Sequence, residues 1–135
     1  MLLLDSEAIS AIANGPDHRR NRVRALVAEM RARELPIATV AAVLAEVVRG
    51  GPADAGVFSG LRRHRVEVHS VDTRVGVRAG QLLGSIGAGS EMAVDAFLVA
   101  DADLRGGAVV ATCDPHDIGR LASLATHVKV ADLGS

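Results

Sequence analysis

The sequence predicts an α/β domain in which a mostly parallel sheet is covered by helices on both faces. Short apolar segments rich in β-branched residues alternate along the chain with longer segments of helical periodicity. No turn typical of a β-hairpin joins two of the apolar segments. With 135 residues, 49% of them apolar, the chain suits one domain that buries roughly two-thirds of its unfolded surface.

In the first half of the chain, two apolar strands are each followed by two helices. Leu2–Leu4 is the first expected strand and Pro36–Ala38 the second. Apolar residues in the segments between them recur at the i, i+3, i+4, i+7 spacing of a buried helix face. Asn14–Gly15 and Gly50–Gly51 provide helix stops. The expected helices are residues 6–14, 17–34, 40–49 (with Thr39 as N-cap) and 53–64.

The second half continues the alternation and ends on a strand. Expected strands lie around 66–71, at 109–112 and at 127–130, and expected helices at 73–86, 91–104 and 115–125. Glycines stand at four-residue intervals in the first of these helices, where each costs about 1 kcal/mol relative to alanine. Such a glycine-lined face allows close approach of another backbone, either in the core or at a subunit interface. These glycines are Gly76, Gly80 and Gly84.

Composition excludes several classes of protein. No apolar run approaches the ~20 residues that span a bilayer, and the N-terminal MLLLDSE lacks the basic and apolar regions of a signal peptide. Cys113 is the only cysteine, so no disulfide framework forms. These features predict a cytoplasmic protein with no membrane association.

The positive charge is almost entirely arginine, which is clustered at residues 19–24 and 62–65. The bidentate guanidinium fork suits phosphate, although such a run also describes a solvated helix face. The chain has no Trp or Tyr and only two Phe residues, so aromatic stacking on bases is nearly unavailable. A nucleic-acid partner would therefore be held through its backbone.

Two carboxylates directly follow predicted buried strands. Asp5 ends Leu2–Leu4, and Asp114 follows Val109–Thr112. The carboxyl ends of parallel strands meet at one edge of the sheet, where open α/β sheets place their sites. Helix capping is the alternative, because each aspartate precedes a predicted helix and Asp117 would favour the helix dipole.

Two further carboxylates lie on predicted helices. Asp95 is the only charge in MAVDAFLVA, whose apolar residues surround the whole helix. A buried carboxylate is costly unless it is paired, hydrogen-bonded or bound to a metal, and a core arginine or backbone donors could also satisfy it. Glu46 lies beside the apolar stripe of its helix. A glutamate at such a position is ordinarily a solvent-exposed residue at the rim of the buried face.

Together these acids predict a divalent cation. Like charges about 4 Å apart repel by ~1 kcal/mol in water and ~4 kcal/mol at an effective dielectric constant of 20. Several carboxylates in one pocket are therefore best explained by a cation that neutralises them. Carboxylate oxygen and water are the ligands that Mg²⁺ or Mn²⁺ prefers. No pair of His or Cys residues has the spacing of a zinc site.

The order LLLDSEAI, AEVVRG, VDAFLVADA and VVATCDPHDIGRL resembles the PIN domain, specifically the VapC-type toxins of bacterial toxin–antitoxin pairs. The resemblance covers residues 1–135 and implies a single PIN-like domain with a doubly wound parallel sheet. It also implies a metal-dependent ribonuclease whose acidic quartet is Asp5, Glu46, Asp95 and Asp114, with Asp117 as a fifth acid. Thr112 fits the hydroxyl residue that usually precedes the fourth acid. The additional acids Asp101 and Asp103 depart from the family pattern and bear on the local surface charge.

The same resemblance assigns roles and partners. Glu46 would complete the metal site or position the attacking water, and a VapB-like antitoxin would block the acidic pocket of a homodimeric toxin. The implied ligands of Mg²⁺ or Mn²⁺ are Asp5, Asp95, Asp114 and Asp117, and the arginines expected to hold the RNA backbone are Arg19, Arg20 and Arg22.

Two other functions remain open. Asp5 and Glu7 stand two apart after a strand, as in phosphohydrolases of the haloacid-dehalogenase type, but Lys129 is badly placed to supply the lysine that this class uses. The chain could also be a non-catalytic PIN-like binding module in which the acids are structural.

Overall fold

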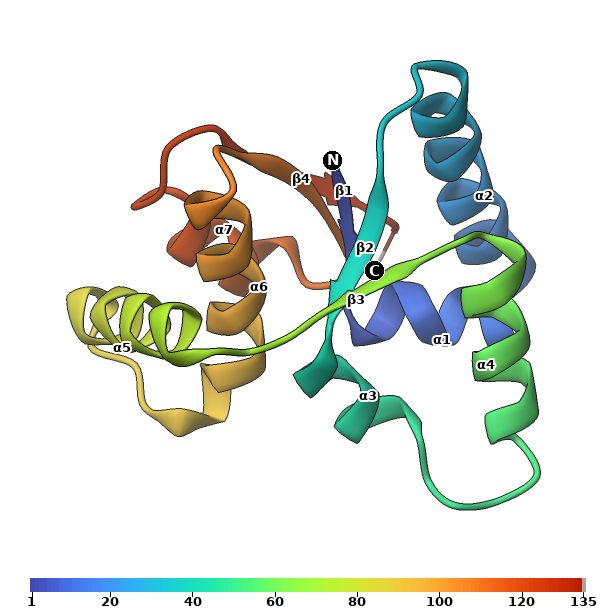
Figure 1. Cartoon of the computed structure of the whole chain (residues 1–135), viewed down its shortest axis with the longest axis horizontal. Coiled ribbons are helices and arrows are strands. Elements are labelled where there is room, and N and C mark those ends of the chain that lie inside the picture. The colour runs from blue at the N-terminus through green and yellow to red at the C-terminus, as the bar shows by residue number, and fades with distance from the viewer. Residues whose placement is uncertain (135) are drawn as a thin grey trace.

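The computed structural model describes residues 1–134, which form five strands, seven α-helices and one short 3₁₀ helix (Figure 1). The strands are β1 (Leu2–Leu4), β2 (Ile37–Val40), β3 (Glu67–His69), β4 (Ala108–Thr112) and β5 (Val128–Asp132). The helices are α1 (Ser6–Asn14), α2 (Asp17–Ala32), α3 (Ala41–Val47), α4 (Asp54–Arg63), α5 (Thr73–Ile86), the 3₁₀ helix η1 (Ser90–Met92), α6 (Ala93–Leu104) and α7 (Pro115–Ala122).

All neighbouring strands are parallel, and their order in the sheet is β3-β2-β1-β4-β5. The chain moves outward from β1 through β2 to β3, then returns to the other side of β1 for β4 and β5. The doubly wound α/β fold predicted above is confirmed. The order reverses between β1 and β4, and sites of such sheets lie outside the carboxyl ends of the strands at this point.

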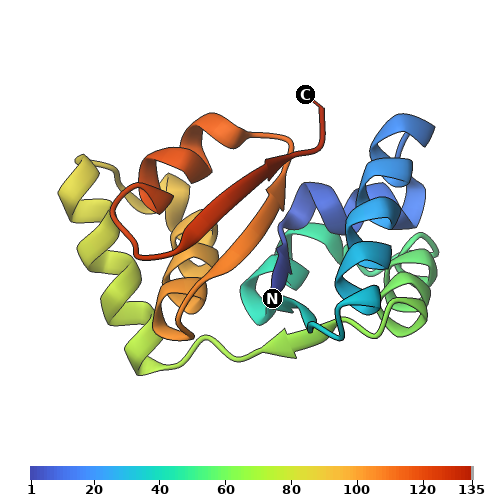
Figure 2. The same cartoon turned by 90° about the horizontal axis from the view of Figure 1, so that it is seen from above.

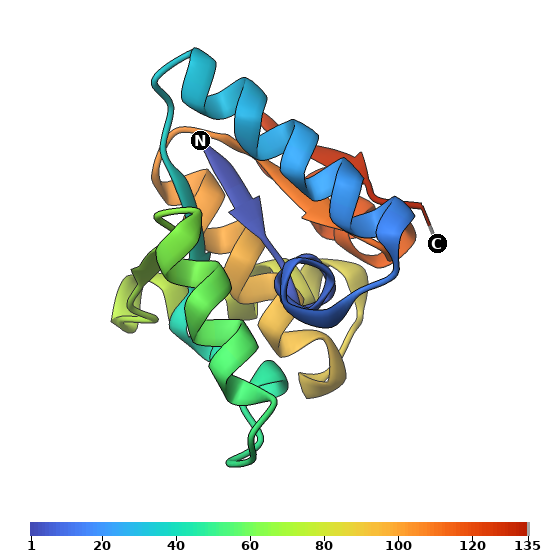
Figure 3. The same cartoon turned by 90° about the vertical axis from the view of Figure 1, so that its right-hand side faces the viewer.

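Helices cover the sheet on both faces. Helices α1, α2 and α4 pack on one side, and α5, α6 and α7 on the other (Figure 2). Helix α3 follows β2 and contacts both α1 and α6. Figure 3 shows α2 and α4 on the flank that faces away from α5.

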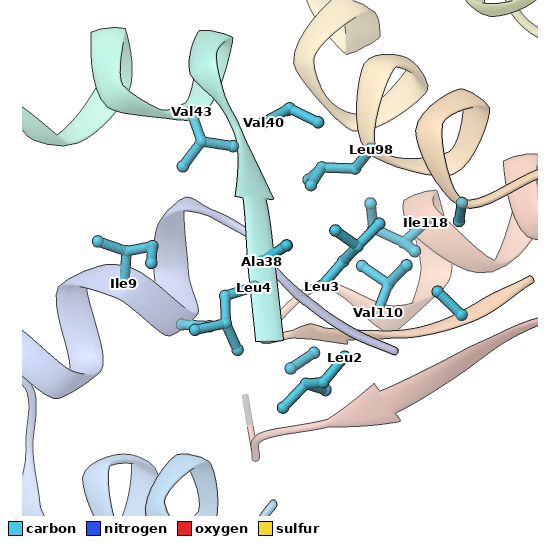
Figure 4. Packing of buried hydrophobic residues seen from close by; sticks show 14 of the residues in the cluster. Leu2, Leu3, Leu4, Ile9, Ala38, Val40, Val43, Leu98, Val110 and Ile118 are labelled. Carbon is cyan, nitrogen blue, oxygen red and sulfur yellow. The ribbon is translucent and has the colours of Figure 1, made fainter. Parts of the chain in front are cut away.

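The core centres on β1, whose three leucines are completely buried. Figure 4 shows Leu2, Leu3 and Leu4 among side chains from both helical layers, with Ile9 from α1 on one side and Leu98 and Ile118 from α6 and α7 on the other. A strand covered on both faces is apolar at every position rather than alternating, which explains the run Leu2–Leu4. Each buried leucine contributes roughly 1.5–3 kcal/mol, so the strand that carries Asp5 is anchored firmly.

The element bounds agree with the sequence predictions apart from a few ends. Thr39 is not the N-cap of α3, because it lies within β2 and its hydroxyl donates to the carbonyl of Leu4 at 2.7 Å. Helix α3 begins only at Ala41, without a side-chain cap. Helix α2 ends at Ala32, shortly before Glu34, which adopts the left-handed conformation (φ 57°).

The glycine-lined face of α5 does not serve core packing. A Cβ atom added at Gly76, Gly80 or Gly84 would meet no heavy atom within 4 Å. The core alternative is therefore wrong, and the face is open in the single chain.

No helix within residues 1–134 is both long and apolar enough to cross a membrane.

Candidate active site

Asp5 lies at the carboxyl end of β1 and is only 5% exposed. Its backbone N–H donates to the carbonyl of Ala111 in the neighbouring strand β4 (3.2 Å). Its Oδ1 accepts the N–H of Ala8 at 2.8 Å, so it caps α1. Capping occupies one of the two carboxylate oxygens, so it does not preclude a second function for this side chain.

Asp114 lies across the switch point, after β4, and caps α7. Its Oδ1 accepts the N–H of Asp117 at 3.3 Å. The backbone N–H of Asp114 donates to the Thr112 hydroxyl oxygen at 2.9 Å, which shapes the turn that carries the carboxylate. Asp114 is exposed, in contrast to Asp5. The predicted capping roles of both aspartates are confirmed.

Burial and neighbouring charge raise the pKa of Asp5 to about 6. Removal of the carboxylate from water is the largest cause, and hydrogen bonds from the Thr112 hydroxyl and the Ala8 amide act in the opposite direction. The negative charges of Asp95 and Glu7 raise the pKa further. Asp95 is 90 residues away along the chain, so its influence reflects the way the fold brings α6 toward the end of β1.

The pKa of Asp95, in the first turn of α6, is also raised to about 6. Partial burial is again the largest cause, followed by the negative charges of Glu46, Asp114 and Asp117. Within residues 1–134, no arginine, lysine or histidine forms an ion pair with Asp95. The core ion pair considered above is therefore not present. We call Asp95, the three acids whose charges raise its pKa and Asp5 the acidic cluster; its members are Asp5, Glu46, Asp95, Asp114 and Asp117.

The acids of this cluster are close enough for their charges to affect Asp5 and Asp95, but they do not form a preformed metal site. Among the residues that the structure describes, no three His, Cys, Asp or Glu side chains are placed so that they could hold one metal ion together. Mg²⁺ keeps several waters and is bound by one or two carboxylates together with substrate phosphates. The all-oxygen donor set therefore fits a hydrated Mg²⁺ or Mn²⁺ in chemistry, but it is not closed around one centre.

The additional acids Asp101 and Asp103 do not belong to this cluster. Asp101 is 2% exposed, and its oxygens lie 2.8 Å from Nδ1 of His69 and 3.0 Å from Nε of Arg105. Asp103 pairs with Arg78 at 2.8 Å. Their charges are thus neutralised within the protein. No sequence pattern indicates the His69–Asp101 pair, because its members are 32 residues apart.

Two of the three arginines expected to hold RNA have partners in the protein. Arg19 donates from Nε to the carbonyl of Gly134 (3.1 Å) and lies 3.9 Å from Glu7. Arg20 donates to the carbonyl of Gly15 at 3.0 Å. Arg22 is exposed and has no side-chain hydrogen bond within residues 1–134.

A pocket of about 260 Å³ lies between α1, α3, α4 and the start of α2, and no member of the acidic cluster lines it. Glu7, whose charge acts on Asp5, lines it together with Val47, which follows Glu46. Its walls are mixed, because small and apolar residues alternate with the polar side chains of α1 and with Arg19 of α2. The remaining lining residues are Ser10, Ala11, Ala13, Asn14, Gly15, Pro16, Arg19, Ala53 and Val57.

Comparison with known proteins gives similarity in structure only. No family model and no curated protein matches the sequence. A chain in the crystal structure of DNA-bound VapBC from Salmonella typhimurium superposes with a TM-score of 0.65 at 21% identity, over 98% of this chain and 97% of that one. A chain in the structure of VapBC2 from Rickettsia felis bound to a promoter DNA fragment gives a TM-score of 0.62 at 19% identity, with coverages of 97% and 98%. Over nearly its whole length, this chain therefore has the fold of chains in VapBC toxin–antitoxin complexes, as the resemblance to VapC-type PIN domains implies.

Proposed function

We propose that this chain is a VapC-type toxin that hydrolyses RNA phosphodiesters with the help of Mg²⁺ or Mn²⁺. The observation that carries the proposal is that the pKa values of Asp5 and Asp95 are both raised, by burial and by the negative charges of acids from distant segments at the switch point of the sheet. Carboxylates whose ionisation is opposed by burial and by one another destabilise the free protein. Strain of this kind is typical of functional sites.

In this proposal each acid has a defined task. A hydrated cation would be held directly by one or two of Asp5, Asp95, Asp114 and Asp117 and through its water molecules by the others, and the exposed Glu46 at the rim would orient the attacking water. When bound, the cation supplies charge stabilisation at the phosphoryl oxygens and lowers the pKa of water. Thr112 positions two of the acids, because its hydroxyl accepts from the Asp114 amide and lowers the pKa of Asp5.

The proposed reaction is hydrolysis. A water oxygen forms a new bond to phosphorus, the bond to one ester oxygen breaks, and the leaving oxygen takes up a proton. Attack requires that the phosphodiester approach a negatively charged cluster, which a bound cation permits. An exposed Asp114 and Glu46 leave the cluster open on the side from which a strand of RNA would arrive.

The proposed partner is a VapB-like antitoxin. The pocket lined by Glu7 and Val47 is the candidate seat for a segment of this partner, because the charge of Glu7 acts on Asp5. We also propose a homodimer. The open glycine-lined face of α5, with Val77 57% exposed, is a candidate surface for the second copy.

Nothing within residues 1–134 favours a phosphohydrolase of the haloacid-dehalogenase type. Lys129 pairs in register with Val109 at the start of β4, whereas Asp114 lies beyond its end. Five residues of extended chain span about 16 Å. Lys129 thus lies far from the acids, near the opposite end of the strands.

The test is cleavage of a labelled RNA pool with and without Mn²⁺. The parental chain should cut RNA only with the metal, and Asp95→Asn should abolish cutting. Asp17→Asn is a matched control, because Asp17 also lies in the first turn of a helix but is exposed and outside the cluster. Cleavage by Asp95→Asn at the parental rate would refute the assignment. Absence of Mn²⁺ or Mg²⁺ binding by calorimetry would favour a non-catalytic binding module.

A further inference from the structure

Positive charge gathers where α4 ends beside α2. Arg24 and Arg31 are seven residues apart on α2, which is two helical turns, so they lie on the same side of the helix. Helix α4 ends at Arg63 and is followed by His64. The end of α4 lies on the same flank of the sheet as α2 (Figure 2), close enough for Arg24 and Arg31 to act on His64. We call these four residues the α2–α4 basic surface.

The three arginines of this surface act on His64. The pKa of His64 is lowered, first by burial and then by the positive charges of Arg31, Arg63 and Arg24. These three arginines come from two helices separated by more than 20 residues and all are exposed. The fold therefore brings together cations that the sequence keeps in two separate clusters.

The described part of the chain offers these cations no counter-charge. Within residues 1–134, none of the three arginines forms an ion pair, and the Nε2 atom of His64 is buried without a hydrogen-bond partner. Glu29, the acid on the same helix, pairs with Arg33 instead. Repulsion among like charges and an unpartnered buried nitrogen both disfavour the free state. A bound anion would relieve both.

We propose that the α2–α4 basic surface binds the phosphate backbone of RNA at a position remote from the acidic cluster. The choice of RNA rests on the ribonuclease function proposed above. Three guanidinium forks suit phosphate oxygens. The near absence of aromatic residues excludes base stacking as the source of affinity.

The surface lies toward the opposite end of the strands from Asp5. Arg19, which lies 3.9 Å from Glu7, an acid whose charge acts on Asp5, precedes Arg31 by twelve residues, which is about 18 Å along the helix. Stacked nucleotides of one strand repeat every ~3.4 Å. The basic surface would therefore contact phosphates about five nucleotides away from the scissile bond, so it would favour long substrates over short ones.

The experiment measures binding of a 5′-labelled single-stranded RNA of roughly twenty nucleotides by fluorescence anisotropy, in EDTA and over a series of salt concentrations. The variant carries Arg24→Gln, Arg31→Gln and Arg63→Gln together. Loss of three phosphate contacts should reduce the slope of log K against log salt by about 2, since each contact contributes ~0.7 for a single strand. Affinity near 0.1 M salt should fall at least tenfold. For single substitutions, Arg31→Gln should weaken binding more than Arg74→Gln, which changes an exposed arginine on α5.

Unchanged affinity and salt slope in a folded triple variant would overturn the proposal, as would an equal loss in Arg74→Gln. If the triple variant binds RNA like the parental chain but no longer binds polyglutamate, the proposal is overturned and the surface is assigned to an acidic protein partner instead. If the parental chain binds RNA in EDTA but cuts none with Mn²⁺, the nuclease proposal fails and this one stands. If the parental chain binds no RNA, this proposal fails.

Discussion

Replacement of Asp5 by asparagine should stabilise the protein at neutral pH, because the ionised Asp5 carboxylate opposes folding. Its pKa is about 6 in the folded protein, against an ordinary value of 3.8. One pKa unit corresponds to 1.36 kcal/mol, so ionisation costs the fold about 3 kcal/mol above pH 6. Asparagine is as good an N-cap as aspartate, so the hydrogen bond from Ala8 should persist in the variant.

The sign of the pH dependence follows from linkage. A carboxyl group with a raised pKa binds protons more tightly in the folded state, so stability declines as pH rises from about 4 to about 6. The stabilisation by Asp5→Asn should therefore reach about 3 kcal/mol at pH 7.5 and fall below ~1 kcal/mol at pH 4. Urea denaturation in EDTA at the two pH values measures the difference. Asp17→Asn, at an exposed position, should give no such pattern.

The same variant tests the cation. Mg²⁺ or Mn²⁺ that binds only the folded protein stabilises it by RT ln(1 + [L]/Kd), about 2.7 kcal/mol at a hundredfold excess over Kd. Added metal should therefore stabilise the parental chain and have a much smaller effect on Asp5→Asn. A variant that is less stable than the parent at pH 7.5, or that gains equally at pH 4, would refute the reasoning about Asp5.

Three further outcomes are expected. Asp101→Ala should lower the free energy of unfolding by about 3 kcal/mol or more in urea denaturation, because it leaves His69 and Arg105 without the buried carboxylate that they share. Gly80→Ala should stabilise the chain by ~1 kcal/mol, since the added methyl group meets nothing within 4 Å; a loss of dimer in size-exclusion chromatography would identify this face as the interface. Thr112→Val should reduce Mn²⁺-dependent cleavage and raise the pKa of Asp5 in an NMR titration, because the hydroxyl lowers that pKa and accepts from the Asp114 amide.

Much of the fold and part of the candidate site follow from local sequence patterns. Leu2–Leu4 is an apolar run and Val109–Thr112 is rich in β-branched residues; neither has helical spacing, and both lie in strands of the sheet. Parallel strands place the residues that follow them at one edge, so the sequence alone predicts that Asp5 and Asp114 share that edge. Asp95 is conspicuous because it is the only charge in an apolar helical segment.

Other features depend on how distant segments pack. The roles of Asp101 and Asp103 follow from partners that are 32 and 25 residues away, His69 and Arg78, which no periodicity reveals. The prediction that Thr39 caps a helix is wrong because its hydroxyl finds the Leu4 carbonyl of the neighbouring strand.

The sequence by itself determined the order and type of the elements, because φ/ψ preferences and the burial period of each segment are local properties. Only the tertiary structure decided which charged side chains come close enough to alter the pKa of another group. Asp95 acts on Asp5 across the switch point, and Arg24 and Arg31 meet Arg63 and His64 across two helices. Electrostatic influence depends on distance in space and on burial rather than on separation along the chain. Those distances and burials exist only once the helices are packed against the sheet.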